Sequence, residues 1–346
     1  MDNAPISVTV AFASEAAANY PVAGVPAAAR AAAAIARAGA AHCTIAVAGG
    51  WTPSNWCRAE WERLAGDMAI VSADLAQVTS NDVSRGENLV SGDFRHVQYR
   101  ANDESEAIAE LRRAGGEILR ATGKPADGIV SRYFNRPISR AISAQALRIP
   151  GVTPFHATLG TAAFGLAMAG ALFLGGHAGL LAGAVLFQAA SIFDGVDGEI
   201  ARATWRSSAS GAKLDSLVDA ATNLAFILGV AFNLWQQGDP TAGLVGLCVF
   251  VVMGTGLFLV GQMAKRKGGD FTFDAMKSKL GQARSRTMRM LTYIAMRDFY
   301  AAGSAVLVLL GFGREMLITF LLVALVWLAL VCFSGLADHR HARKAL

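Results

Sequence analysis

Four aspartates in one apolar stretch are the residues of this chain best suited to chemistry: Asp194, Asp197, Asp215 and Asp219. The first two are three residues apart and the last two are four apart, so on helices each pair shares one face. Two such helices facing each other would gather four carboxylates that repel one another unless they are protonated or bind a cation. Hard oxygen ligands at this density suit Mg²⁺, Mn²⁺ or Ca²⁺ and leave room for two ions. The alternative is that they are helix caps and surface charges at a membrane boundary.

The residues between these aspartates carry a longer pattern, D-x2-D-G-x2-A-R-x8-G-x3-D-x3-D. It resembles the signature of the CDP-alcohol phosphotransferases, which are integral membrane enzymes. The resemblance implies a two-metal site for Mg²⁺ or Mn²⁺ with Asp194, Asp197 and Asp215 as ligands. It makes Asp219 either a further ligand or the general base on the acceptor hydroxyl. The donor would be bound by the remaining signature residues, Gly198, Ala201, Arg202 and Gly211, and by Thr153 and Pro154 further upstream. Arg202 would contact donor phosphate or, alternatively, stabilise the helix end.

Two features near this signature modify what the resemblance implies. Phe155 follows Pro154 where the family commonly has an Asn that contacts cytosine, so the base is expected to be recognised by stacking or by other residues. Arg297 and Asp298 lie inside an apolar stretch and resemble an Arg-Asp pair of the inositol-linked branch. They are expected to form either a structural ion pair or a polar contact in an acceptor cavity.

The composition predicts that much of the chain lies in lipid, because 53% of the 346 residues are hydrophobic and only 16% are charged. Six stretches are long and apolar enough to span a bilayer: 155–175, 179–203, 212–235, 241–264, 287–311 and 315–337. Basic residues gather before the first span, in the second and fourth links, and after the sixth span. The positive-inside rule then predicts a multi-pass protein of the inner (cytoplasmic) membrane with both termini and the signature on the cytoplasmic side.

The first 125 residues alternate strand-like and helix-like segments and predict a cytoplasmic α/β domain with a mainly parallel sheet. Strands are expected at 6–13, 43–48 and 68–72, and helices at 27–38, 55–65 and 104–122. The run 21–26, followed by Arg30, resembles the opening of a sugar-nucleotidyltransferase domain, in which a Gly-rich loop, an Arg and a Lys hold phosphates. This chain has no glycine at 13–18 and Ala27 where the Lys would stand. The domain is therefore expected to have that fold without the activity; the alternative is an unrelated α/β domain.

Residues 126–150 are expected to form a linker helix at the membrane interface, ahead of the membrane domain at 151–346. Arg132, Arg136 and Arg140 recur every four residues, although Pro137 is expected to kink or restart the helix. These arginines would face anionic headgroups or, alternatively, line a pocket for a phosphorylated acceptor, and the two roles are compatible. The run 124–139 resembles the connector of fused enzymes that join an inositol-phosphate cytidylyltransferase to a di-inositol-phosphate phosphate synthase.

Together these features predict an enzyme that transfers a phospho-alcohol or phosphatidyl group from a CDP-alcohol or CDP-diacylglycerol to a hydroxyl acceptor, releasing CMP, in inositol-linked or phospholipid synthesis. The resemblance makes inositol phosphate one possible acceptor, and membrane lipid and a second copy of the chain, as a homodimer, are expected partners. No basic and aromatic patch of the kind that binds nucleic acid is present. Two other functions remain open: a membrane transporter that uses the intramembrane acids, and a non-catalytic scaffold.

Overall fold

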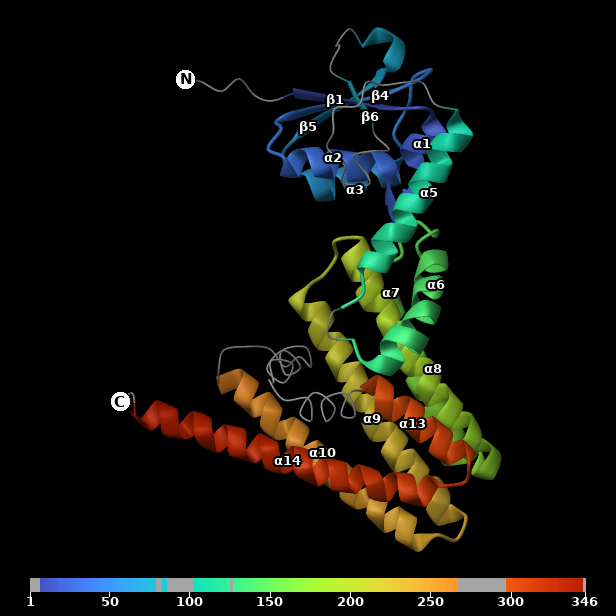
Figure 1. Ribbon diagram of the computed structural model, residues 1–346, viewed down its shortest axis with the longest axis vertical. Helices are drawn as coiled ribbons and strands as arrows, with labels where there is room; N and C mark the ends of the chain where they lie inside the picture. Colours follow the sequence, from blue (N-terminus) through green and yellow to red (C-terminus); the bar gives the residue numbers. More distant parts are fainter. Residues whose placement is uncertain (1–6, 79–82, 86–102, 125–126, 267–296, 345–346) are drawn as a thin grey trace. The chain divides into compact units, whose positions relative to one another are not determined.

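The computed structural model describes residues 7–78, 83–85, 103–124, 127–266 and 297–344 (Figure 1). The chain forms two compact units. The first unit contains residues 1–122, 141–152 and 199–205, and the second contains 123–140, 153–198 and 206–346. The short segment 199–205 thus belongs to the first unit although the helix that leads into it belongs mostly to the second.

The first unit is built on a four-stranded parallel sheet of order β5-β4-β1-β6. The strands are β1 (Ser7–Phe12), β4 (His42–Val47), β5 (Ala69–Asp74) and β6 (Val83–Arg85). Figure 1 shows α2 (Ala27–Arg37) and α3 (Asn55–Ala65) together on one side of this sheet. Parallel neighbours need such helical crossovers, so the alternating sequence pattern produces this α/β layer. The predicted strands, helices and parallel sheet of this region are confirmed.

Small residues let α2 pack closely on the sheet. Its alanines, from Ala27 to Ala33, are almost all fully buried with Ile35, against Val10, Phe12 and Ile45 of the strands. A short α1 (Glu15–Asn19) follows β1, and its N-terminus is capped by the Ser14 hydroxyl, which accepts from the Ala17 N–H at 3.1 Å. A capped helix therefore stands where the nucleotidyltransferase resemblance would have a Gly-rich loop.

A tight hairpin lies between α1 and α2. Its strands are β2 (Pro21–Val22) and β3 (Val25–Pro26), which pair antiparallel. The two turn residues, Ala23 and Gly24, both have positive φ, of 42° and 81°, which is the geometry of a type I′ turn. The first unit also contains α5 (Glu104–Ala121), which packs against α1 and β2.

The second unit is helical. Its helices are α7 (Pro154–Leu174), α8 (Gly176–Ala203), α9 (Ala209–Gln236), α10 (Pro240–Arg266), α13 (Arg297–Leu309) and α14 (Gly313–Lys344), although the end of α8 belongs to the first unit. Within the described residues, four of them, α7 to α10, are long and apolar enough to cross a membrane. The predicted fifth span, 287–311, lies partly outside the described residues, and α13 is a shorter apolar helix. The predicted total of six spans thus stays a prediction.

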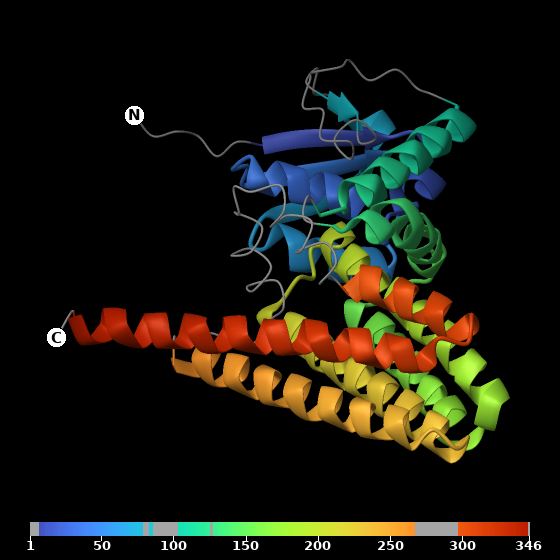
Figure 2. The same ribbon diagram turned by 60° about the horizontal axis from the view of Figure 1, so that its bottom comes forward.

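Close helix packing positions α8 and α9 against α7. Leu172 of α7 lies against Gly183 of α8 and Gly229 of α9, and a Cβ atom at either glycine would collide with its side chain. Deeper in the same core, Phe187 of α8 stacks on Phe226 of α9 with ring centroids 3.9 Å apart. Glycine at such contacts lets membrane helices approach closely. On another side of this unit, α10 and α14 lie side by side along their length (Figure 2).

The linker helix begins irregularly. A π-helical turn, Ser131–Asn135, precedes α6 (Arg136–Ala146), and the Arg136 N–H bonds to the carbonyl of Ser131, five residues back. Pro137 has no N–H to donate, and a π turn is one way in which a helix adjusts to such a gap. The π turn also changes the helix faces: Arg132 is exposed, whereas Arg136 is only 7% exposed. The predicted common basic face of these two arginines is therefore wrong.

Candidate active site

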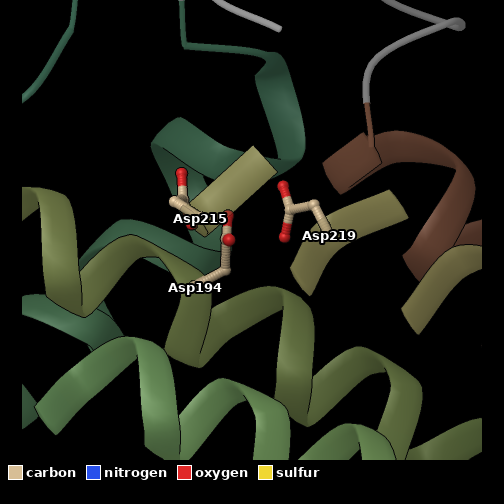
Figure 3. Close-up of side chains that lie close together, drawn as sticks. All are labelled: Asp194, Asp215 and Asp219. Carbon is tan, nitrogen blue, oxygen red and sulfur yellow. The ribbon is translucent and has the colours of Figure 1, made fainter. Parts of the chain in front are cut away.

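Three of the four signature aspartates converge in the second unit. Asp194 comes from α8, and Asp215 and Asp219 come from successive turns of α9, with their carboxyl groups turned toward one another (Figure 3). One carboxylate oxygen from each lies within 4.8 Å of the others, and all three residues are half-buried. Sequence spacing predicted two facing helices that each carry acids three or four residues apart. In the structure α8 and α9 are these helices, and their facing brings the groups together.

Asp197 lies beside this cluster but is more deeply buried, at 8% exposed. Its carboxylate accepts a hydrogen bond from the Thr158 hydroxyl of α7 at 3.0 Å, and it lies close to the carboxyl group of Asp215. Three helices, α7, α8 and α9, therefore contribute to one polar site. Asp197 is oriented by its hydrogen bond to Thr158 of α7, whereas the other three acids lie with their carboxylate oxygens within 4.8 Å of one another.

The donor set fits a divalent cation. Carboxylate oxygens are the ligands that Mg²⁺ and Mn²⁺ prefer, and three of them from two rigid helices within 4.8 Å can reach one ion or two closely spaced ions. Like charges brought together in a partly buried position repel, and a bound cation removes that repulsion. Asp194, Asp215 and Asp219 therefore fit a metal ion by their chemistry as well as by their geometry.

A buried ion pair braces α8 beside this cluster. The Arg136 guanidinium donates to both carboxylate oxygens of Asp127, at 2.9 and 3.0 Å, and to the carbonyl of Gly195 at 3.3 Å. Burial alone would raise the pKa of Asp127, but the hydrogen bonds and charge of Arg136 outweigh it and lower that pKa below its ordinary value. The structure engages the Arg136 side chain with the link and with the residue after Asp194, and its predicted role toward headgroups or an acceptor stays a prediction.

The predicted donor-binding residues of the second unit occupy helix ends and turns. Thr153 caps α7, with its hydroxyl 2.8 Å from Nδ1 of His156, and Pro154 is the first residue of that helix. Gly211 is exposed in the first turn of α9, where its N–H donates to the Ser208 hydroxyl at 3.0 Å. Gly198 is half-buried on α8, one residue after Asp197.

Ala201 and Arg202 lie on the last turn of α8, in the first unit. The Arg202 side chain is half-buried, and its Nε donates to the carbonyl of Thr122 at 2.7 Å. Arg202 thus joins the end of α8 to the residue that follows α5. Its role in binding donor phosphate stays a prediction.

Of the two predicted acceptor residues on α13, the structure describes the side chain of Asp298 but not that of Arg297. The Asp298 carboxylate accepts from the backbone N–H of Ser131 at 2.6 Å, at the start of the π turn, and closely contacts Gly128. Asp298 thus holds the start of the linker helix, a contact that no local pattern could predict. The side chain of Arg297 lies outside the described part of the structure, and Arg132 is exposed on the π turn.

Two residues of the site region were missed by sequence reasoning, Thr158 and Asp127. A single Thr in an apolar helix carries no signal of its own, because only the tertiary fold shows that its hydroxyl meets Asp197. Asp127 lies in a turn-rich link, and its partner Arg136 is nine residues away. An acid within reach of a basic helix is the only signal that could have suggested this pair.

Comparison with known proteins agrees with this geometry. Residues 152–332 match the family model described as CDP-alcohol phosphatidyltransferase. Proteins named bifunctional IPC transferase and DIPP synthase are similar to the chain. The one from Thermococcus kodakarensis is 33% identical over 169 residues, which is 49% of this chain and 36% of that protein. The one from Archaeoglobus fulgidus is 31% identical over 186 residues, which is 54% of this chain and 33% of that protein.

The matched part therefore spans only about a third of the length of these relatives. The family model, by contrast, covers just over half of this chain and includes all four aspartates. The resemblance drawn from the signature, including its inositol-linked branch, is confirmed. The chain belongs to the CDP-alcohol phosphatidyltransferase family.

Proposed function

We propose that this protein transfers a phospho-alcohol or phosphatidyl group from a CDP-linked donor to a hydroxyl acceptor and releases CMP. The observation that carries the proposal is the convergence of Asp194, Asp215 and Asp219, with oxygens within 4.8 Å, inside the segment that matches the family. A transporter or a scaffold does not need this arrangement of acids within the complete signature.

Asp194, Asp197 and Asp215 would hold Mg²⁺ or Mn²⁺ in a two-metal site, with Asp219 as a further ligand or as the base that acts on the acceptor. The bound ions would neutralise the donor pyrophosphate and the charge that develops on departing CMP. Thr158 keeps one oxygen of Asp197 directed toward α7 through its hydrogen bond, which fixes the orientation of that carboxylate. Arg136 holds the α8 backbone at Gly195, between the two acids of that helix.

Asp219 would act on the acceptor. A carboxylate oxygen of Asp219 takes the proton of the acceptor hydroxyl as the hydroxyl oxygen forms a bond to the alcohol-linked phosphorus of the donor. The bond from that phosphorus to the oxygen bridging it to CMP then breaks, and CMP leaves with the electron pair. Phosphoryl transfer of this kind depends mainly on positioning and electrostatic stabilisation, which rigid helices supply well.

The donor would lie along α8 and the first turn of α9, where Gly198 and Gly211 allow a nucleotide to approach the backbone. The names of the relatives include IPC transferase and DIPP synthase, which favours an inositol-linked donor or acceptor for this chain. The acceptor would then be an inositol phosphate or a similar polyol phosphate, near Arg132. The cytoplasmic side of the inner membrane is the proposed location of this site, in keeping with the distribution of basic residues.

The α/β region is proposed to have no cytidylyltransferase activity of its own. Ser14 caps the helix that begins at Glu15, so no loop is present there to hold a triphosphate. Arg30 is 3% exposed and donates to backbone carbonyls, so its side chain does not support binding of a triphosphate either. The test is direct: purified protein with CTP and inositol phosphate should form no CDP-inositol, and formation of CDP-inositol would refute this part.

The transferase proposal is tested by incubating purified protein with a panel of donors, CDP-inositol and CDP-diacylglycerol among them, and a panel of hydroxyl acceptors. CMP release should require both an acceptor and Mg²⁺ or Mn²⁺, and EDTA should abolish it. For variants in which a signature aspartate is changed to asparagine, Asp67→Asn, at an exposed position of the α/β region, is the control for the loss of one negative charge. Absence of CMP release with every pair, from folded protein with metal present, would contradict the proposal.

A further inference from the structure

The last turn of α8 is held by side chains from the α/β region. All of the contacts involved lie within the first unit, which includes residues 199–205. A helix end leaves its final carbonyls without helical partners, and these need other donors. At this end the donors are arginines from α2 and α3, two helices that are more than a hundred residues away in sequence.

Arg30 of α2 makes the central contact. Its guanidinium donates to the carbonyls of Val22 and Ala23 in the hairpin, at 2.7 and 3.1 Å, and to the carbonyl of Ala203, the last residue of α8, at 2.5 Å. One buried side chain thus joins the hairpin to the helix end. A guanidinium at the C-terminus of a helix also interacts favourably with the helix dipole.

Arg63 of α3 extends the contact to the next two residues. It donates to the carbonyl of Thr204 at 2.9 Å and to that of Trp205 at 3.4 Å, and it is oriented by an ion pair with the buried Glu60 at 2.6 Å. The Thr204 hydroxyl completes the set by donating to the carbonyl of Ile200 at 2.7 Å.

The ring of Trp205 contacts two arginines. The guanidinium carbons of Arg30 and Arg37 are 4.5 and 4.2 Å from the centre of its ring, and its backbone has a φ of 52°, which is costly for a residue with a side chain. A backbone conformation of this kind persists when its surroundings hold it. Gly24 in the hairpin is packed against Leu147 and Thr204, so a side chain there would collide with this arrangement.

We propose that Arg30 and Arg63 are positioning residues, through which the α/β region fixes the C-terminal end of the helix that carries Asp194 and Asp197. The helix α8 runs from Gly176 to Ala203 without a break, so restraint of its last turn acts on the same rigid element as those two acids. In the nucleotidyltransferase resemblance this arginine would neutralise phosphate. Here its Nε and Nη2 groups donate to backbone carbonyls, which gives the α/β region a role that does not need a nucleotide.

The first test uses amide hydrogen exchange of the full chain in lipid nanodiscs. Arg30→Met removes the donors and keeps the length of the side chain, and Arg58→Met, at an exposed position of α3, is the matched control. Amides of 199–205 should exchange about tenfold faster in Arg30→Met, as expected for loss of a charged hydrogen bond. Amides of β1 and β4 should stay protected in both variants, which serves as the internal control for folding.

A second variant decides the outcome if Arg30→Met loosens the sheet. The double substitution Glu60→Gln with Arg63→Met removes the bonds to Thr204 and Trp205 without leaving a buried carboxylate beside an uncharged partner, and Glu60→Gln alone is its control. The double variant should expose 199–205 to exchange, and Glu60→Gln should do so far less. Unchanged exchange at 199–205 in a variant with a protected sheet would overturn the proposal.

A second measurement, which rests on the proposed function, separates positioning from general destabilisation. The metal concentration that gives half-maximal CMP release should rise about tenfold in the double variant, at the lower end of what loss of a supporting contact costs a metal site. A smaller folded fraction would lower the rate without moving that concentration. If the wild type releases no CMP, the proposed function fails while the exchange experiment still tests the positioning role.

Discussion

The arginines of the α/β unit and the signature acids of the helical unit use their charges in opposite ways. In the α/β unit the arginine side chains satisfy the backbone: the buried Arg30 bonds three carbonyls, and the more exposed Arg63 bonds two carbonyls and the carboxylate of Glu60. In the helical unit the acids of α8 and α9 bring like charges together, with oxygens of Asp194, Asp215 and Asp219 within 4.8 Å. The first arrangement stabilises a fold, whereas the second costs stability unless a cation offsets it.

This difference indicates where function resides. Clustered like charges persist in a protein when they perform chemistry, because stability alone would favour their removal. The α/β unit has the opposite character: Arg30 and Arg63 donate to backbone carbonyls, so that their charges support the fold. The comparison thus assigns the reaction to the helices and a supporting role to the α/β region, and the following predictions test each side of it.

The largest effect is expected from Asp215→Asn, which removes the acid that contacts both Asp197 and the other cluster members. Loss of a metal ligand removes several kcal/mol of transition-state stabilisation, so CMP release should fall by about a thousandfold or more. Turnover measured across a range of Mg²⁺ and Mn²⁺ concentrations checks this. Turnover like that of the wild type would show that the reaction does not need the carboxylate of Asp215.

Asp219→Asn should divide the cluster into two roles. As a general base, Asp219 acts on the acceptor, so its loss should lower kcat by about two to four orders of magnitude while donor affinity changes little. Asp194→Asn should instead weaken donor binding through the metal. Calorimetric titration with donor, beside turnover, distinguishes the two. Equal loss of donor binding in both variants would make Asp219 a metal ligand, and the base would have to be sought elsewhere.

Substitution of Thr158 is expected to have a smaller effect on activity and to test a single hydrogen bond. Thr158→Val keeps the shape of the side chain but loses the hydroxyl that donates to Asp197 at 3.0 Å. Loss of an orienting contact beside a metal ligand typically costs about 10- to 100-fold in activity or metal affinity. Thr158→Ser, which keeps the hydroxyl, is the matched control. If Val and Ser variants behave alike, the hydrogen bond does not orient Asp197.

Much of this arrangement could be predicted from sequence because it is encoded locally. Alternating apolar segments indicated the strands and helices of the first unit, and the spacing of Asp194, Asp197, Asp215 and Asp219 indicated that they share helix faces. The apolar runs indicated α7 to α10. These signals depend on residues a few positions apart, so no knowledge of the tertiary fold is needed to read them.

The contacts that could not be predicted join distant residues. The bond from Arg30 to Ala203 spans 173 residues, and that from Ser131 to Asp298 spans 167. Arg136 was predicted to share a basic face with Arg132, and the π turn before Pro137 placed it in a buried pair with Asp127 instead. Periodicity assumes a regular helix, and it therefore fails where the backbone departs from one.

The smallest expected effect concerns pH. Because the folded-state pKa of Asp127 is lowered, its pair with Arg136 contributes stability above the unfolded pKa, near 4, and that contribution is lost as pH falls through the folded value. The melting temperature of the wild type should fall by a few degrees more than that of Asp127→Asn between pH 6 and pH 3. Parallel pH profiles for the two proteins would show that the pair contributes no pH-dependent stability.

We expect the clustered acids of α8 and α9 to lower the stability of the fold unless a cation is bound. Thermal unfolding with and without metal tests this expectation directly. In EDTA, Asp215→Asn should melt at a higher temperature than the wild type, because one of the mutually repelling carboxylates is gone. Mn²⁺ should raise the melting temperature of the wild type, as binding to the folded state requires, and should raise that of Asp215→Asn far less. A wild type that does not respond to Mn²⁺, together with an Asp215→Asn variant that is less stable in EDTA, would contradict the account.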